Sequence, residues 1–293
     1  MEQVVYNKSE VTVLQPGTLK EALKLINENQ DADIIANASD YWPRFMKGEV
    51  RPKKILDISG LIQDLSYVKK EGNLIRLGAL VTVSQLEKQD FIQLKQFAAF
   101  REAISKFGSP QIRNVATVGG NVCAASSSED LIPIFLTFNA KVRLTSVDGD
   151  RYISLEKFIL GKRQINRRPN EILTEVVIED PGESYASTFN KIGLRNALII
   201  NVVNLAVLGK IVDKKIEDIR IAANRVKGKV PERAKETESF LKGKELNQDT
   251  VLSAKKVFDQ ELSLTDDFRA SASYRKALLL TLLERSLNKL GGV

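Results

Sequence analysis

The stretch "QIRNVATVGGNVCAASSSEDLIP" (residues 111–133) combines two adjacent glycines, a run of small residues and the carboxylate of Asp130. Glycine reaches positive φ without strain and lets a backbone approach a ligand closely. Successive backbone N–H groups in such a turn bind anions, and Thr117 and Asn121 add side-chain hydrogen-bonding groups. The segment Thr117-Val118-Gly119-Gly120-Asn121 therefore suits a phosphate or a pyrophosphate, although a glycine pair by itself more often marks a purely structural turn.

The spacing of these glycines excludes two common nucleotide fingerprints. It is neither the G-x-G-x-x-G of nicotinamide-binding proteins nor the G-x-x-x-x-G-K-[ST] phosphate loop. A second loop of small residues follows an apolar strand in "IIANASD" (residues 34–40). We interpret the two loops as the halves of one dinucleotide cradle.

Residue counts restrict the chemistry further. The chain has 293 residues, enough for a sizeable core and for two or three subdomains. It contains no histidine and one cysteine, Cys123. These counts exclude an internal disulfide, a zinc or iron–sulfur site housed by this chain alone, and Ser-His-Asp catalysis. Any chemistry must come from carboxylates, lysine, tyrosine, backbone groups or a bound cofactor.

The net charge of +7 is spread along the chain. Its densest stretches, "KRQINRR" (162–168) and "RVKGKVPERAK" (225–235), are expected to be solvated loops or a subunit interface. Neither contains an aromatic residue, so nucleic-acid binding is not expected. No apolar run approaches the ~20 residues of a membrane span. The N-terminus lacks a signal-peptide pattern, which makes a cytoplasmic location the default expectation.

The pattern of elements predicts an α+β protein without a strict βαβ rhythm. The chain opens with a strand, a helix capped by Thr18 with Glu21 in a capping box, and a second strand. Residues 91–108 read as one helix, and Asp148-Gly149 as the turn of a hairpin. We place the main boundary near Pro181-Gly182. Several strands follow it, with turns at Gly209 and Lys214-Lys215, and then three helices.

Residues 111–121, with Asp130 and Pro133 downstream, resemble one family closely. They are similar to the pattern IRN-x-(A/G)-T-(I/V)-GGN of the FAD-binding (medium) subunits of molybdenum hydroxylases. That family includes the flavin subunits or domains of xanthine dehydrogenase, bacterial carbon monoxide dehydrogenase and nicotinate dehydrogenase. The resemblance covers most of the chain, from residues 36–40, at the family's AGGTD, to "SASYRKALLLTLLERSL" near the C-terminus.

The resemblance implies a fold and a site. It implies a two-subdomain FAD-binding domain of the vanillyl-alcohol-oxidase/PCMH-like type over residues 1–178, with subdomains of about 1–58 and 59–178. A C-terminal α+β domain follows over residues 179–293. Matching positions imply that FAD contacts Ala36, Asn37, Ala38, Ser39, Asp40, Phe107, Thr117, Val118, Gly119, Gly120, Asn121, Asp130, Leu173 and Lys191. No catalytic residue and no metal site are implied on this chain.

Two of these positions, Asp130 and Lys191, allow another interpretation. Asp130 either hydrogen-bonds a polar part of FAD or caps the helix that begins after it. Lys191 either stabilises the reduced flavin by its charge or is an ordinary strand-surface lysine. Cys123 is most simply a small buried residue beside the loop.

The first loop departs from the family pattern, because Asn37-Ala38 stands where the family usually has Gly-Gly. Positive φ costs a residue that carries a Cβ about 1–2 kcal/mol, although asparagine tolerates it better than most. We expect a reshaped or weakened loop that still binds FAD.

The family's function implies electron transfer rather than bond-making on an organic substrate. A small subunit would hold two [2Fe-2S] clusters and a large subunit molybdopterin, while this chain passes electrons through FAD to NAD or another acceptor. The alternative is a structural or assembly subunit of the same fold that has lost FAD.

Overall fold

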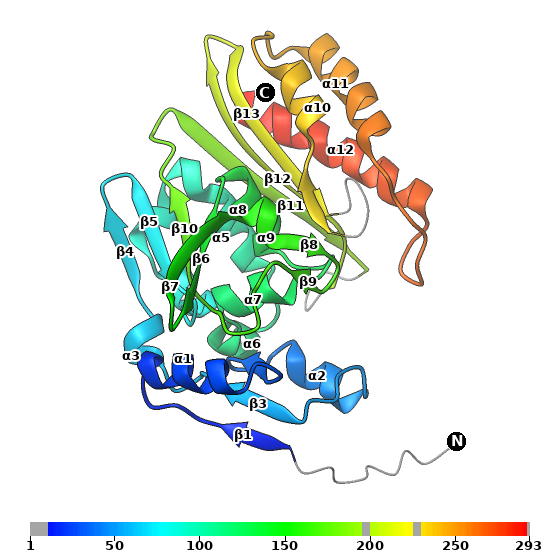
Figure 1. The fold of residues 1–293 in the computed structure, drawn as a ribbon. Helices are drawn as coiled ribbons and strands as arrows, with labels where there is room; N and C mark the ends of the chain where they lie inside the picture. The colour runs from blue at the N-terminus through cyan, green and yellow to red at the C-terminus, as the bar shows by residue number, and fades with distance from the viewer. Residues whose placement is uncertain (1–10, 195–199, 225–229, 292–293) are drawn as a thin grey trace.

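The computed structural model describes residues 11–194, 200–224 and 230–291. The segments 195–199 and 225–229 and the two chain ends lie outside this description, and the second of these segments is the first part of the basic stretch 225–235. Figure 1 shows a small N-terminal lobe of α1, α2 and β3 below a larger body, with α10, α11 and α12 at the far end.

The strands form four sheets, with orders β1-β3-β2, β4-β5-β10-β6-β7, β11-β12-β13-β14 and β8-β9. Their bounds are β1 Thr12–Leu14, β2 Asp33–Ile35, β3 Lys54–Asp57, β4 Val68–Glu71, β5 Leu74–Gly78, β6 Lys141–Ser146, β7 Gly149–Ser154, β8 Ile159–Gly161, β9 Gln164–Ile165, β10 Ile172–Glu179, β11 Tyr185–Gly193, β12 Asn201–Val212, β13 Lys215–Asn224 and β14 Pro231–Arg233.

The helices are α1 Leu19–Glu28, α2 Tyr41–Met46, α3 Ile62–Leu65, α4 Val83–Glu87, α5 Ala98–Ser105, α6 Pro110–Val115, α7 Val118–Ala124, α8 Leu131–Thr137, α9 Leu155–Phe158, α10 Lys235–Leu241, α11 Gln248–Glu261 and α12 Ala272–Gly291. Two 3₁₀ turns, η1 Asp90–Gln93 and η2 Lys95–Phe97, precede α5. This mixture of helices with mostly antiparallel sheets confirms the predicted α+β class.

The N-terminal lobe is a parallel three-stranded sheet with α1 packed on it. The predicted strand–helix–strand order is confirmed. Thr18 caps α1 by accepting a hydrogen bond from the Glu21 N–H at 3.2 Å. The other half of the predicted capping box differs, because the Glu21 carboxylate accepts from the Gly17 N–H at 2.8 Å instead of from Thr18.

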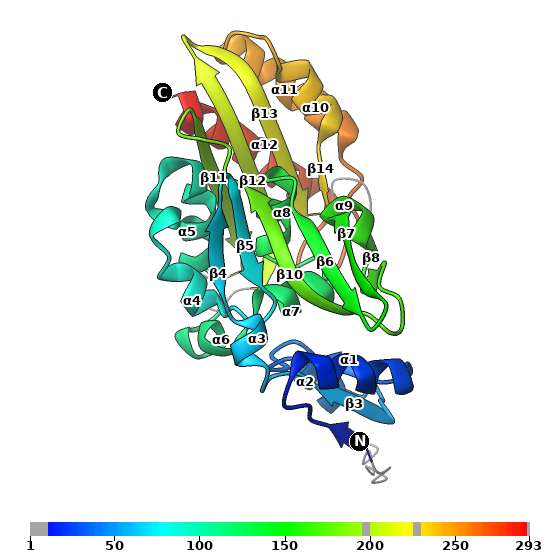
Figure 2. The same cartoon turned by 60° about the vertical axis from the view of Figure 1, so that its left-hand side comes forward.

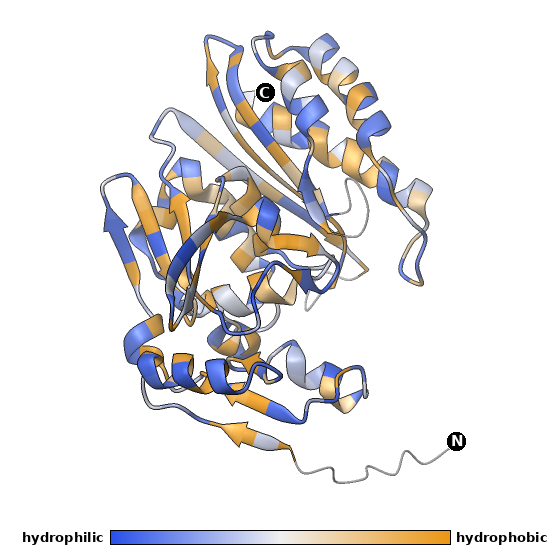
Figure 3. Cartoon of the chain, in the orientation of Figure 1, coloured by the Kyte–Doolittle hydropathy of each residue, from blue (hydrophilic) through white to orange (hydrophobic). Residues whose placement is uncertain are grey.

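The five-stranded sheet is antiparallel and carries the predicted hairpin, β6–β7, whose turn residue Gly149 has a φ of 118°. At one edge, β4 is hydrophilic while its neighbour β5 is hydrophobic (Figure 3). An edge strand faces solvent, so this contrast matches the position of the two strands.

The four-stranded sheet is buried on both faces. In β12, Leu205 and Val207 pack against the C-terminal helices, whereas Ala206 and Leu208 join the core shared with the five-stranded sheet. This alternation is the period of two expected of a strand. Figure 2 shows α10, α11 and α12 covering one face of this sheet.

Two predicted details of the fold are wrong. Residues 91–108 are not one helix: Leu94 is extended between η1 and η2, and α5 begins only at Ala98. The Arg101 guanidinium binds the carbonyls of Ile92 and Gln93, which a continuous helix would use internally. Gly209 is not in a turn either, because β12 runs through it, and a Cβ there would lie 3.3 Å from Leu290 of α12.

None of the helices in the described ranges is long and apolar enough to cross a membrane.

Candidate functional site

A cleft lies between the N-terminal part of the protein and the larger body, and it consists of two cavities. We call the cavity of about 320 Å³ the first lobe of the cleft and the cavity of about 270 Å³ its second lobe. Both are lined by the same six residues, which join them: Ile34, Ala36, Tyr41, Arg44, Gly120 and Cys123. Two adjoining cavities of this size suit an elongated ligand.

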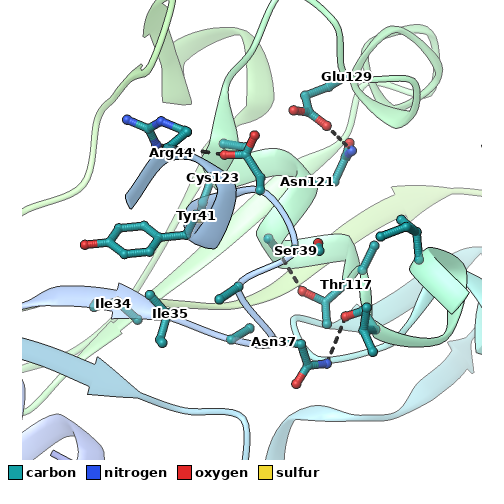
Figure 4. A pocket seen from close by; sticks show the side chains of 18 of the residues that line it. Ile34, Ile35, Asn37, Ser39, Tyr41, Arg44, Thr117, Asn121, Cys123 and Glu129 are labelled. Atoms are coloured by element: carbon teal, nitrogen blue, oxygen red, sulfur yellow. Dashed lines mark hydrogen bonds and ion pairs between the residues drawn. The ribbon is translucent and has the colours of Figure 1, made fainter. Parts of the chain in front are cut away.

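The loop at residues 36–40 connects β2 to α2 and lines the first lobe (Figure 4). Within the described part of the chain, none of its backbone N–H groups donates a hydrogen bond. Its side chains fix it to the larger body. Asn37 donates to the Val115 carbonyl at 2.9 Å, and Asp40 accepts two hydrogen bonds from Arg163, at 2.6 and 2.9 Å. This loop therefore offers oriented backbone donors to a ligand.

Strain in this loop lies at one residue. Ala38 has a φ of 52°, in the left-handed region, whereas Asn37 does not have positive φ. The departure from Gly-Gly therefore costs conformational energy at the alanine and not at the asparagine.

The segment at residues 117–121 is not the predicted turn. Thr117 caps α7, and Gly119 and Gly120 lie in the first turn of that helix without positive φ. Its backbone N–H groups already have protein partners: Val118 donates to Val81 O, Gly119 to Ala79 O, Gly120 to Thr117 Oγ1, and Asn121 to Thr117 O. The expected concavity of free N–H donors is therefore absent from these four residues.

The two glycines are explained by close packing. A Cβ on Gly119 would lie 2.8 Å from both the Cβ and the carbonyl oxygen of Ala79. A Cβ on Gly120 would lie 2.8 Å from the capping Oγ1 of Thr117. Glycine thus lets α7 begin directly against the segment that follows β5, and this contact brings Gly120 to the junction of the two lobes.

Arg44 and Tyr41 lie one helical turn apart on α2 and line both lobes. The Arg44 guanidinium is only loosely paired, 3.8 Å from carboxylate oxygens of Asp40 and of Glu49. The Tyr41 hydroxyl donates to Asp33, and burial with this hydrogen bond raises the pKa of Tyr41 above its ordinary value. Arg44 is therefore a loosely paired cation at the junction of the two lobes.

The basic stretch 162–168 is not simply a solvated loop. Arg163 binds the first loop through Asp40 and also donates to the Ala124 carbonyl at 3.0 Å. Arg167 lines the second lobe, where its guanidinium donates to the carbonyls of Arg168, Pro169 and Glu171. Burial lowers the pKa of Arg167. The expectation of a merely exposed stretch is wrong for both arginines.

Asp130, just before α8, and Lys191 of β11 form a buried ion pair. Their charged atoms lie 2.5 Å apart, and the Asp130 carboxylate also accepts from Asn201 and Asn204. Asp130 makes no capping hydrogen bond to α8, and Lys191 is only 8 % exposed. Both of the alternatives raised by the sequence, a helix cap and a surface lysine, are therefore wrong. Neither residue lines either lobe.

Cys123 lies at the junction of the lobes. Burial raises the pKa of its thiol to about 12, against the opposing charge of Arg167. The thiol is therefore protonated at neutral pH and is a poor nucleophile. Among the described residues, no group of three or more histidine, cysteine, aspartate or glutamate side chains is arranged to hold a metal ion.

The structure brings most of the predicted contact residues to the cleft. Those in the first lobe are Ala36, Asn37, Ala38, Ser39, Asp40, Phe107, Thr117, Gly120 and Asn121. Gly119 and Leu173 line the second lobe. Val118 is fully buried away from both.

Sequence reasoning missed Arg44, Tyr41, Arg167 and Glu129, all of which line the cleft. The i, i+3 spacing of Tyr41 and Arg44 directly after a polar loop would have indicated one helix face had α2 been predicted. No local signal identifies Glu129 or Arg167, whose positions depend on tertiary packing.

The cleft, its free loop donors and Arg44 suit an elongated anionic ligand, and comparisons with known proteins specify the class of protein. The model "FAD binding domain in molybdopterin dehydrogenase" matches residues 8–180, and "CO dehydrogenase flavoprotein C-terminal domain" matches residues 189–290. The chain therefore belongs to the family of FAD-binding subunits of molybdopterin dehydrogenases, which confirms the resemblance seen at residues 111–133.

Individual relatives agree with this assignment. The chain is 32% identical over 266 residues to the nicotinate dehydrogenase FAD-subunit of Eubacterium barkeri, with 89% of each protein covered. It is 27% identical over 274 residues to the xanthine dehydrogenase FAD-binding subunit of Escherichia coli O157:H7, with 93% of each covered. A chain of reconstituted CO dehydrogenase from Oligotropha carboxidovorans shares the fold, with a TM-score of 0.90, 22% identity, and coverage of 96% of this chain and 98% of that one.

The residues of the cleft fit FAD. The unpaired N–H groups of residues 36–40 together with Arg44 suit the diphosphate of this cofactor. The amide oxygen of Asn121, which is buried without a hydrogen-bond partner among the described residues, marks a position where a polar group is missing.

Proposed function

We propose that this chain is the electron-transferring flavin subunit of a molybdenum hydroxylase complex. The observation that supports it best is the two-lobed cleft with free backbone donors in the loop at residues 36–40, in a chain of this family. When bound, FAD would supply the redox chemistry, taking electrons from the [2Fe-2S] clusters of a small partner subunit and passing them to NAD or another acceptor.

The role of this chain's own residues is binding and orientation. Residues 36–40 and Arg44 would hold the diphosphate, while Asn37 and Arg163 keep the loop seated on the larger body. Phe107 and Leu173 would contact the ends of the cofactor in the first and second lobes respectively. Asp130 and Lys191 would act from behind the cavity wall by fixing β11 to the helix pair α7–α8.

We also propose the partner subunit and the domain bounds that the family implies. A large subunit would carry molybdopterin and determine the organic substrate. The chain would divide into residues 1–178 and 179–293, and its first part into about 1–58 and 59–178. The change of sheet between β10 and β11 supports the main division, and the separate sheet β1-β3-β2 of the N-terminal lobe supports the smaller one.

Reconstitution tests this function in two steps. The purified full chain is mixed with FAD, desalted and examined for a bound flavin spectrum; about one FAD per chain is expected. The chain is then produced together with the reading frames that adjoin its own, and the purified complex is reduced and offered NAD⁺ or a quinone. Oxidation of the bound flavin by one of these acceptors supports electron transfer.

Two results would overturn the proposal. A chain that stays colourless and takes up no FAD would support the structural or assembly subunit instead. A complex whose bound FAD is not reduced when its iron–sulfur centres are reduced would exclude the electron path.

A further inference from the structure

Arg167 is a cation of the larger body that lines the second lobe of the cleft. It lies in the segment between β9 and β10, whereas Arg44, the other arginine of this lobe, lies on α2 of the N-terminal part of the protein. Among the described residues, no lysine and no third arginine lines either lobe. Arg167 is thus the cation that the larger body contributes to the cleft.

Only one nitrogen of the Arg167 guanidinium is hydrogen-bonded within the described part of the protein. Nη1 donates to three backbone carbonyls, at 3.1, 3.0 and 2.8 Å, which belong to Arg168, Pro169 and Glu171. Nε and Nη2 donate to no described residue, and neither atom is buried. These two nitrogens form the donor edge with which a guanidinium binds a carboxylate or a phosphate at two points.

The positive charge of Arg167 has no ion-pair partner among the described residues, although the residue is half-buried. The nearby ionisable groups are Asp33, Cys123 and Glu171. Glu171 accepts two hydrogen bonds from Arg151, at 2.5 and 2.8 Å, and the thiol of Cys123 is protonated. Asp33 lines the same lobe without forming an ion pair with Arg167. Because charges that are removed from water are normally paired, a ligand anion would complete the environment of Arg167.

The two lobes differ in the balance of their charged side chains. The first lobe is lined by Asp40, Glu129 and Arg44, and the second by Asp33, Arg44 and Arg167. Two arginines against one aspartate leave the second lobe with a formal excess of positive charge, whereas the first lobe has an excess of negative charge. An anion is therefore favoured on the side of the junction that both arginines line.

We propose that Arg167 binds the diphosphate of the cofactor from the larger body, on the side of the cleft opposite Arg44 and the loop at residues 36–40. The inference rests on the proposed binding of FAD. The diphosphate is a dianion, and one arginine from each side of the cleft matches its charge. Nη1 stays on the backbone while Nε and Nη2 face the ligand, so the guanidinium is ordered before the cofactor binds.

Ligands with and without phosphates test the contact. Isothermal titration of the full chain compares FAD with riboflavin, and ADP with adenosine. Arg167→Gln removes the charge but keeps an amide that can donate to the backbone carbonyls. It should weaken FAD and ADP about tenfold, as for a lost charge-assisted hydrogen bond, and leave riboflavin and adenosine unchanged. Arg168→Gln is the matched control, because it makes the same change of net charge at a side chain that is 70% exposed; it should bind all four ligands as wild type does.

A second variant, Arg167→Lys, separates charge from shape with FAD alone. Lysine keeps the positive charge and loses the two-point donor edge. A diphosphate attracts either cation, so Arg167→Lys should bind FAD no more than about threefold more weakly than wild type, and more tightly than Arg167→Gln. Urea denaturation of both variants shows whether either change disturbs the fold, and similar unfolding curves are expected for the two.

The outcomes separate this inference from the function it rests on. If the wild-type chain binds no FAD, the proposed function fails. If wild type binds FAD and Arg167→Gln binds FAD and ADP equally well, Arg167 does not contact the diphosphate while the function stands. A loss for riboflavin or adenosine as large as the loss for FAD would overturn the diphosphate contact too, because it would show that Arg167 supports a ring site or the fold. The same conclusion follows if Arg167→Lys weakens FAD as much as Arg167→Gln does.

Discussion

The loop at residues 36–40 and the segment at residues 117–121 line the same lobe of the cleft, yet they differ in whether their backbone N–H groups are hydrogen-bonded within the protein. The second contains the glycines, and its N–H groups from Val118 to Asn121 are all bonded within the protein. The first contains no glycine, and its N–H groups are free within the described chain. Glycine content therefore marks where the backbone is packed most closely, while ligand donors lie where the backbone is left unpaired.

The largest expected effect tests the packing role of Gly119. Gly119→Ala places a Cβ against backbone and Cβ atoms of Ala79, which no side-chain rotation can relieve. We expect a loss of about 2 kcal/mol in the free energy of unfolding, even after the helix propensity gained by alanine. Urea denaturation of the full chain measures it.

The matched control for that variant is Gly60→Ala, where a Cβ meets no atom within 4 Å. Its effect should lie within about 0.5 kcal/mol of wild type. Equal unfolding curves for the two variants would refute the packing explanation of Gly119.

A smaller effect tests the cap of α7. Thr117→Val keeps the shape of the side chain and removes the acceptor of the Gly120 N–H. The free energy of unfolding should fall by about 1 kcal/mol, as for other lost N-caps. Thr281→Val is a fitting comparison, because the Thr281 hydroxyl bonds a carbonyl inside α12 and caps nothing. Should both variants unfold alike, the cap does not explain the threonine.

The anchoring of the first loop is tested by Asn37→Ala. The variant removes the hydrogen bond from the Asn37 amide to Val115, so that the loop must be ordered when the cofactor binds. We expect FAD affinity to fall about threefold, corresponding to one modest hydrogen bond. Isothermal titration measures it, with the exposed Asn27→Ala as control. An unchanged affinity would mean that the loop is held without Asn37.

Much of the fold could be predicted because its signals are local. The cap at Thr18 and the hairpin turn at Gly149 depend on neighbouring residues. The break at Leu94 could not be predicted in this way, since it depends on Arg101 binding the carbonyls of Ile92 and Gln93.

The site was predicted less completely because it depends on contacts between residues that lie far apart in the sequence. The motif placed Gly120 and Asn121 correctly in the cleft, but it could not show that their N–H groups are bonded. Arg163 reaches Asp40 across 123 positions of sequence, and Lys191 reaches Asp130 across 61. Such pairings depend on how distant parts of the chain pack together. Composition alone gave no sign of them, and it predicted a solvated loop or a subunit interface for residues 162–168.

The smallest expected effect concerns Asn37 and Ala38, which stand where the family usually has Gly-Gly, because it tests which of the two carries the backbone strain. Only Ala38 has positive φ. Ala38→Gly should remove about 1–2 kcal/mol of backbone strain and lose part of that gain to the greater freedom of glycine in the unfolded chain. A net stabilisation of about 0.5 kcal/mol is expected, with FAD affinity equal to wild type or slightly higher. Ala36→Gly, where φ is not positive, should destabilise the chain instead. If Ala38→Gly were as destabilising as Ala36→Gly, the strain assigned to the first loop would not exist.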